Sequence, residues 1–236
     1  MIMKKIMLFF FLLFSSFFFS NITVSNAENT ENGAKRMTEM IVDREKEEYI
    51  RMYNEIYQKS LIQQIEFESE ILIPDYIDFK YVEYAYNLAN QLGFSTRTVF
   101  RLIFKESSFI DTINSPAGAN GLMQLMPETR ILYRKNLRTD TLNLDKNQED
   151  IYIGLNILKN QYEYWRGRGN SENYSWKLSL ATYNAGIVAV NKYKGIPPYK
   201  ETTDFITFIL KTHSNPTFYA NILKREKNEN TVKISS

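Results

Sequence analysis

Apolar residues recur at three- and four-residue steps along most of this chain, which is the spacing of one face of an α-helix. The first such stretch runs from Lys35 to about Ser69 and stops before Pro74. It encloses a run of mixed charges over residues 43–48, which is typical of a solvated helix face. The pattern predicts an amphipathic helix that packs on the following domain or acts as an arm for a protein partner or a coiled coil.

A second helical stripe covers residues 81–92, and Gly93 follows it as a C-terminal stop. Ser95 can then cap a third helix, which leads directly into Glu106. Residues 107–120 contain serine, proline, glycine and asparagine without helical periodicity, so they are predicted to form a loop. Glu106 is therefore expected near the C-terminus of a helix.

The remaining pattern is also helical. Residues 121–126 predict a short helical turn that ends or changes direction near Pro127. Longer apolar stripes follow over 151–165 and over 176–186, and a last major helix is predicted around Phe205–Ile209. The sequence therefore predicts a mainly α fold with little or no β structure.

The N-terminal residues are typical of an export signal. Lys4 and Lys5 precede an apolar run from Ile6 to Phe19, and Ser25-Asn26-Ala27 supplies small residues for a signal peptidase. The run is shorter than the roughly 20 apolar residues that a membrane-spanning helix needs, so cleavage after residue 27 is favoured over a retained anchor. Cysteine is absent, which excludes disulfides and a lipid anchor on a processed N-terminal cysteine.

Charge and composition limit the classes of ligand. The formal net charge is +2, and residues 1–27 contain two lysines and no acid, so the processed chain is near neutral. A neutral balance argues against nucleic-acid binding. The single histidine, His213, and the spacing of the acids support neither a metal site nor a cofactor. The chain is predicted to be a monomer.

One carboxyl group stands out as a candidate catalyst. Glu106 lies at the end of an apolar helix. Desolvation by apolar neighbours raises the pKa of a carboxyl group into the range that acid catalysis needs. Most glycosidases use two carboxyl groups, whereas here one is well framed. The side chains expected to desolvate it are Phe104, Met123, Met126 and Tyr183.

Four segments in order resemble the catalytic domain of soluble lytic transglycosylases, a relative of goose-type lysozyme. They are Glu106-Ser107, residues 121–127, residues 183–186 and Glu201-Thr202, and the resemblance spans roughly residues 79–208. It implies a helical, lysozyme-like domain that cleaves the bond between N-acetylmuramic acid and N-acetylglucosamine in peptidoglycan glycan strands. In that family one glutamate acts as acid and then as base, and the muramoyl 6-hydroxyl attacks to give a 1,6-anhydro end.

The resemblance also implies roles for single residues. Glu106 matches the catalytic acid and base, and Tyr183 matches a tyrosine whose hydroxyl contacts it. Ser115, Gln124 and Met126 match positions that line the sugar subsites. Supporting roles are implied for the remaining matched residues, Ser107, Asn184 and Glu201. Phe205-Ile206 replaces the tyrosine-valine pair of the family and so lacks one hydroxyl.

The predicted layout is a signal over 1–27, a polar tether and helical extension over 28–74, a catalytic domain over 75–225 and a polar tail over 226–236. The tether comprises residues 28–34. Two alternatives remain open at this stage. A goose-type muramidase would cleave the same bond with water, and a wall-binding component of a secretion or assembly machine would use its N-terminal helix to recruit a partner. Each places the protein in the periplasm, the cell wall or outside the cell.

Overall fold

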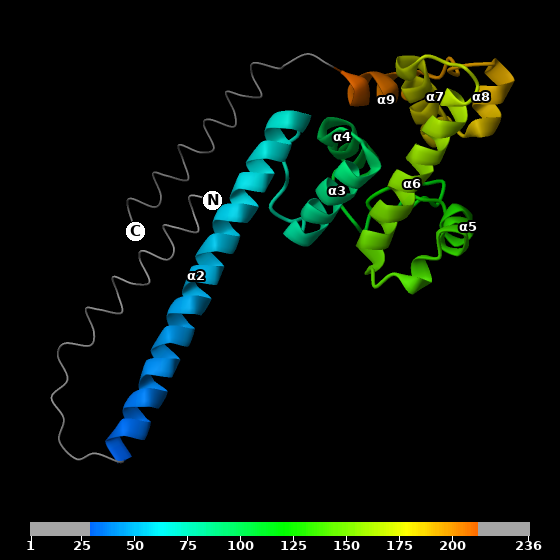
Figure 1. Cartoon of the computed structure of the whole chain (residues 1–236). Helices are drawn as coiled ribbons and strands as arrows, with labels where there is room; N and C mark the ends of the chain where they lie inside the picture. The colour runs from blue at the N-terminus through cyan, green and yellow to red at the C-terminus, as the bar shows by residue number, and fades with distance from the viewer. Residues whose placement is uncertain (1–28, 212–236) are drawn as a thin grey trace. The chain divides into compact units, whose positions relative to one another are not determined.

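The computed structural model describes residues 29–211, with side chains placed from Lys35 onward. Within this range the chain is built from helices, and its β structure is limited to isolated bridges from Asn114 to Asn120 and from Asn120 to Leu125 (Figure 1). The prediction of a mainly α fold with an N-terminal helix is confirmed. Among the described helices, none combines the length and the apolar character needed to span a bilayer.

Several predictions concern residues beyond this range. The export signal over 1–27, the histidine His213 and the polar tail over 226–236 lie outside the described residues.

The first described helix, α2, runs from Asn29 to Ser69. It is helical from Asn29, where a tether was predicted up to residue 34. The chain divides into two compact units between Glu55 and Ile56, so α2 crosses that division. Every residue of α2 from 35 to 60 is exposed.

The end of α2 belongs to the second unit. Ile65 is fully buried there, and Ile71 and Ile73 of the following segment are buried as well. The Glu66 carboxylate accepts a hydrogen bond from the backbone N–H of Ile73 at 2.8 Å. The helix ends at Ser69, and the chain has left the helical conformation before it reaches Pro74. The last turns of α2 therefore pack with the helices that follow.

Helix α3 (Phe79–Leu92) ends at the predicted stop, Gly93, and α4 (Thr96–Ser107) begins at the predicted cap, Ser95. Gly93 ends α3 in the left-handed conformation, with φ of 74°. The Ser95 hydroxyl accepts a hydrogen bond from the backbone N–H of Thr98 at 3.1 Å, which satisfies one free donor at the start of α4. The inward face of α4 leads to Glu106 in its last turn.

Helix α5 (Pro127–Leu137) corrects one prediction. Residues 121–124 form a turn, and Pro127 begins a helix instead of ending one. Proline is well suited to the first position of a helix, where its missing N–H would have no partner. A 3-10 helix, η1 (Thr139–Thr141), and the long helix α6 (Lys146–Arg166) follow.

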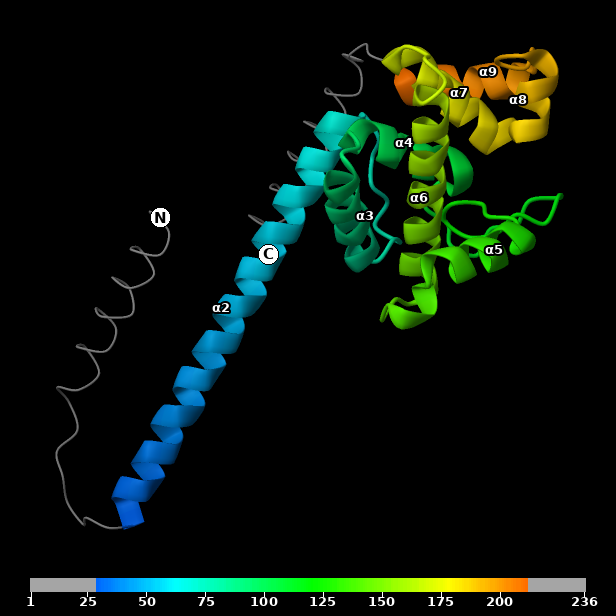
Figure 2. The same cartoon turned by 45° about the vertical axis from the view of Figure 1, so that its right-hand side comes forward.

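The C-terminal part of the described chain contains α7 (Glu172–Ala185), α8 (Ile187–Tyr193) and α9 (Lys200–Leu210). The short helix α8 was not predicted; Gly186, with φ of 81°, separates it from α7. Helix α6 lies at the centre of the second unit and contacts α3, α5 and α7, while α9 packs against α4 and α7 (Figure 2).

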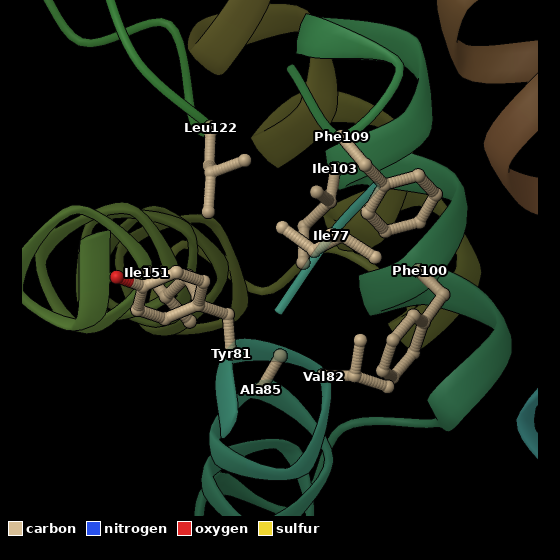
Figure 3. A pocket seen from close by; sticks show the side chains of 9 residues that line it. All are labelled: Ile77, Tyr81, Val82, Ala85, Phe100, Ile103, Phe109, Leu122 and Ile151. Carbon is tan, nitrogen blue, oxygen red and sulfur yellow. The ribbon is translucent and has the colours of Figure 1, made fainter. Parts of the chain in front are cut away.

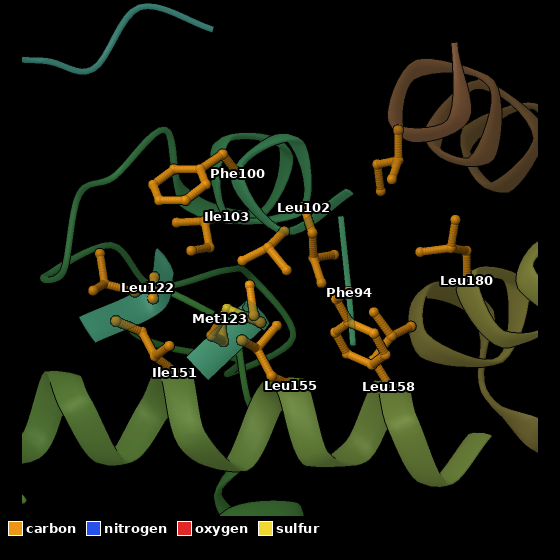
Figure 4. Packing of buried hydrophobic residues seen from close by; sticks show 14 of the residues in the cluster. Phe94, Phe100, Leu102, Ile103, Leu122, Met123, Ile151, Leu155, Leu158 and Leu180 are labelled. Atoms are coloured by element: carbon orange, nitrogen blue, oxygen red, sulfur yellow. The ribbon is translucent and has the colours of Figure 1, made fainter. Parts of the chain in front are cut away.

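The loop after α4 is pressed into the core between α4 and α6. Leu122 and Met123 of this loop lie among Leu102 of α4 and Leu155 of α6, and all of these side chains are buried (Figure 4). A Cβ atom on Gly154 of α6 would lie 2.6 Å from the Met123 Cε atom. The glycine therefore permits the close approach of the loop to α6.

A small apolar cavity of about 10 Å³ lies on the core side of the same loop (Figure 3). Its walls come from α3, α4, α6 and the connecting segments, and none of the predicted site residues lines it. A cavity with so little polar surface does not attract water. It is a packing gap lined by Ile77, Tyr81, Val82, Ala85, Phe100, Ile103, Phe109, Leu122 and Ile151.

Candidate active site

Glu106 is held in the last turn of α4 and is half-buried. The pKa of its carboxyl group is raised from 4.5 to about 8, mainly by burial and secondarily by the negative charge of Glu201, while Lys105 acts to lower it. The partial negative charge at a helix C-terminus acts in the same direction as burial. The carboxyl group is therefore protonated at neutral pH and can donate a proton.

The loop after α4 forms a compact turn around Ser115. The Ser115 N–H donates to the Ala119 carbonyl oxygen at 2.8 Å, and the Ser115 hydroxyl oxygen accepts from the Ala119 N–H at 3.0 Å. The Gly121 N–H donates to the Ile113 carbonyl oxygen at 3.2 Å and closes the loop on itself. The Ser115 hydroxyl keeps its own hydrogen for another acceptor.

Gln124 is locked into the same loop. Its Nε2 group donates to the carbonyl oxygens of Ile113 at 3.1 Å and Gly121 at 3.0 Å. Its backbone has φ of 46°, a left-handed conformation that non-glycine residues seldom adopt. Both amide hydrogens hold the loop, so the side chain offers its Oε1 atom to a ligand as a hydrogen-bond acceptor.

Tyr183 connects α7 to the loop. Its hydroxyl donates to the Met123 carbonyl oxygen at 2.9 Å. The pKa of this hydroxyl is raised well above 10, mainly by burial and secondarily by the charge of Glu106, while Arg130 acts to lower it. Glu106 and Tyr183 thus lie within electrostatic reach of each other. The hydroxyl proton is directed to the loop backbone, and the predicted contact of the hydroxyl with Glu106 stays a prediction.

The remaining predicted residues lie in different environments. Met126 precedes α5 and its side chain is 38% exposed, as a surface for a sugar face requires. Ser107 is buried, and its hydroxyl donates to the Ile103 carbonyl oxygen at 3.2 Å within the same helix. Ser107 therefore has a local structural role.

Asn184 and Glu201 lie where α7 ends and α9 begins. The Thr202 hydroxyl donates to the Asn184 Oδ1 atom at 2.8 Å and ties the two helices together. Glu201 is exposed in the first turn of α9. Phe205 and Ile206 are buried in the core, so this pair supplies bulk to the packing of α9.

A buried ion pair under the loop was not predicted. Asp150 of α6 is fully buried and pairs with Arg130 of α5. The Arg130 Nη2 atom donates to the Asn120 Oδ1 atom at 2.8 Å. A Cβ atom on Gly121 would collide with the Asp150 carboxylate. In the sequence, the burial of Asp150 is indicated only by its place directly before Ile151, which lies on the inward face of the predicted helix.

Glu106 at the end of α4 thus lies within electrostatic reach of Glu201 at the start of α9 and of Tyr183 on α7, and the Tyr183 hydroxyl in turn binds the loop. The family model of the transglycosylase SLT domain matches residues 83–206, more than half of the chain. The chain belongs to this family. All eight predicted site residues lie inside the match, and the described part of the matched segment is mainly α.

Two solved structures are similar to this SLT-domain chain. The 70 kDa soluble lytic transglycosylase of Escherichia coli has 22% sequence identity and a TM-score of 0.45, and the match covers 55% of this chain and 23% of that protein. An inactive variant of the lytic transglycosylase Slt of Pseudomonas aeruginosa has 23% identity and a TM-score of 0.43, with 62% and 24% covered. The present chain thus spans about a quarter of the length of either protein.

Proposed function

We propose that this protein is a peptidoglycan lytic transglycosylase that cleaves the β-1,4 bond between N-acetylmuramic acid and N-acetylglucosamine. The observation that carries the proposal is the raised pKa of Glu106, about 8, inside an SLT domain. A carboxyl group that stays protonated at neutral pH is the group needed to donate a proton to a departing sugar oxygen.

In the first step Glu106 donates its proton to the glycosidic oxygen as the bond to the muramoyl C1 atom breaks. The N-acetylglucosamine unit leaves with a new hydroxyl group, and positive charge develops at C1. The N-acetyl group of the substrate stabilises this charge, so a second protein carboxylate is not needed as a nucleophile. Glu106 is left ionised.

In the second step the ionised Glu106 acts as the base. It accepts the proton of the muramoyl 6-hydroxyl group while that oxygen forms a bond to C1, which gives the 1,6-anhydro ring. The carboxyl group regains its proton and water is not consumed. A group with a pKa close to the working pH serves both steps, because neither protonation state is costly to reach.

The loop residues supply contacts of different chemistry. The Gln124 Oε1 atom accepts a hydrogen bond from an N-acetyl N–H group, and the Ser115 hydroxyl donates one to a sugar oxygen. Met126 packs its exposed side chain on an apolar sugar face. The proposal is supported by the bonds that leave Oε1 of Gln124 and the hydrogen of Ser115 available.

One observation favours a second candidate, hydrolysis of the same bond. Glu201 is exposed and lies close enough to Glu106 for its charge to raise the pKa of Glu106. A second carboxylate at such a position can act as a base on water and would make the protein a goose-type muramidase. In that case the product carries a reducing end.

Mass spectrometry of the products from purified sacculi tests both candidates. The transglycosylase reaction gives anhydro ends that are lighter than reducing ends by one water. Reducing ends alone would establish the muramidase reaction, and absence of any soluble product would reject both. The Glu106→Gln variant is the control for contaminating activity, since it removes only the acid.

We further propose export to the periplasm or the cell wall, and a protein partner for the N-terminal helix. The partner proposal is supported by exposed apolar side chains on α2, among them Met37, Met40 and Met52. Replacing these three with glutamine in the full chain should abolish capture of the partner from an envelope extract and leave cleavage of sacculi unchanged. Equal capture by the wild type and by the substituted protein would count against this role.

A further inference from the structure

Arg101 of α4 joins segments that are far apart in the sequence. Its Nε atom donates to the Ser69 carbonyl oxygen at 2.6 Å, at the end of α2. Its Nη1 atom donates to the carbonyl oxygens of Phe208 at 3.1 Å and Lys211 at 2.7 Å, at the end of α9. The guanidinium group thus satisfies carbonyl groups that a helix end leaves without partners.

Arg97, one turn earlier on α4, repeats the arrangement. Its Nε atom donates to the Glu68 carbonyl oxygen at 3.0 Å, and its Nη1 atom donates to the Lys211 carbonyl oxygen at 3.2 Å. The ends of α2 and α9 are therefore both fastened to the same face of α4.

Glu70 completes the group. Its carboxylate pairs with the Arg101 Nη2 atom at 2.7 Å, and the two side chains are only 5% and 4% exposed. Glu70 has φ of 56° at the end of α2, a position where glycine is the usual residue. Glycine would adopt this conformation without a steric cost but would lack the carboxylate. A buried ion pair is weak evidence for stability, and fixing one geometry is a better-supported role.

The fastened helices carry the two acidic residues of the site. Helix α4 ends with Glu106, and α9 begins with Glu201. The two helices also contact each other through Phe104 of α4, which stacks on Phe208 of α9 with ring centroids 5.9 Å apart. A movement of α9 along or away from α4 changes the distance between Glu106 and Glu201, whose charge acts on the Glu106 carboxyl group.

We propose that Glu70 and Arg101 form a positioning clamp that holds α9 against α4 and thereby sets the environment of Glu106. The kinetic part of this inference rests on the proposed function. Residues 68–70 lie outside the family match, which begins at residue 83. The clamp therefore adds the end of α2 to the segments that position Glu106. Glu70 and Arg101 act through the helices and are positioning residues.

The test uses the full chain with Glu70→Gln or Arg101→Lys, and with Glu68→Gln as a matched control. The control removes the same charge from the same helix end, but the Glu68 carboxylate accepts from Gln64 at 2.9 Å and not from an arginine. Glu70→Gln keeps an oxygen that Arg101 can bond, which makes it the milder change. The measurements are the pKa of Glu106, by NMR of its carboxyl carbon, and kcat and KM on sacculi fragments.

Both clamp variants should lower the pKa of Glu106 by about one pH unit, because α9 loosens and water reaches the carboxyl group. They should lower kcat by about tenfold to a hundredfold, with a smaller change in KM, as a misplaced catalytic group does. The control should match the wild type. Clamp variants that only unfold at lower temperature, with an unchanged Glu106 pKa and kcat, would overturn the inference. The pKa needs no substrate, so it tests the clamp even if the wild type releases no product.

Discussion

The charge of Glu201 at the start of α9 raises the pKa of Glu106 at the end of α4. Burial is the larger cause, so the acid of the proposed reaction is prepared mainly by the packing around α4 and secondarily by a neighbouring carboxylate. Glu106 is therefore protonated at neutral pH.

Replacing Glu106 with glutamine should lower the rate of product release by about a hundredfold to ten-thousandfold, the range that a general acid contributes. The amide has the same shape as the carboxyl group but cannot donate and regain a proton in the reaction. Release of soluble muropeptides from sacculi measures the effect, and a circular dichroism spectrum checks that the helices remain. Wild-type rates in this variant would reject Glu106 as the acid.

The same variant should be more stable than the wild type at alkaline pH. Folding raises the pKa of Glu106 from 4.5 to about 8, so the folded chain binds this proton more tightly than the unfolded chain. The resulting stability is fully present below about pH 4.5 and is lost as the pH rises through about 8, at about 1.4 kcal/mol per pH unit. Thermal unfolding at pH 5 and pH 9 measures this, and an advantage of Glu106→Gln that does not grow with pH would contradict it.

The rate of the wild type should fall as the pH rises through about 8, because the acid loses its proton there. Glu201→Gln removes the negative charge and should move this alkaline limb to lower pH. Asp204→Asn is the control, since Asp204 lies on the same helix and pairs with Lys200. A pH profile of kcat/KM measures both, because this ratio reports the pKa values of the free enzyme. An unmoved limb in Glu201→Gln would show that Glu201 has no influence on the acid.

The sequence contained most of the information on the positions of the helices. The predicted stop at Gly93 and cap at Ser95 are confirmed, because caps act within a few residues of their own position. The prediction at Pro127 is wrong, because proline occurs at both ends of helices and the choice depends on the loop before it. Helix α8 was missed because it is shorter than two periods of an apolar stripe.

Partnerships between distant residues could not be predicted in the same way. Arg101 and Arg130 look like surface residues in the sequence, since arginine is rarely buried without a partner. Their partners, Glu70 and Asp150, are 31 and 20 positions away, and only the packing of the helices brings them together. The bonds that commit the Gln124 amide hydrogens to the loop depend on a turn whose conformation has no periodic signal.

Tyr183→Phe should lower the free energy of unfolding by about 1 kcal/mol, because the Met123 carbonyl oxygen loses its hydrogen bond. It should also lower kcat/KM, since Gln124 follows directly on the segment that this bond holds. Tyr164→Phe is the control, because Tyr164 is an exposed tyrosine on α6. Urea unfolding and the kinetics on sacculi fragments measure the two effects. Identical behaviour of both variants would mean that the Tyr183 hydroxyl does not position the loop.

Substitutions at two glycines of the loop distinguish the cost of backbone strain from the cost of a collision with the buried Arg130–Asp150 ion pair. Gly118 and Gly121 have φ of 95° and 80°, so alanine at either position adopts a left-handed conformation at a cost of roughly 1–2 kcal/mol. A Cβ atom meets nothing within 4 Å at Gly118, whereas at Gly121 it collides with the Asp150 carboxylate. Gly121→Ala must therefore displace either the loop or Asp150.

Gly121→Ala should accordingly lose about 1–3 kcal/mol more stability than Gly118→Ala, the usual cost of overpacking. Its KM should rise more than that of Gly118→Ala, because a displaced Gly121 carbonyl no longer holds the Gln124 side chain. Urea unfolding gives the first comparison and initial rates against substrate concentration give the second. Equal KM values in two folded variants would show that the seat of the loop on Asp150 does not govern sugar binding, and would assign Gln124 to loop stability alone.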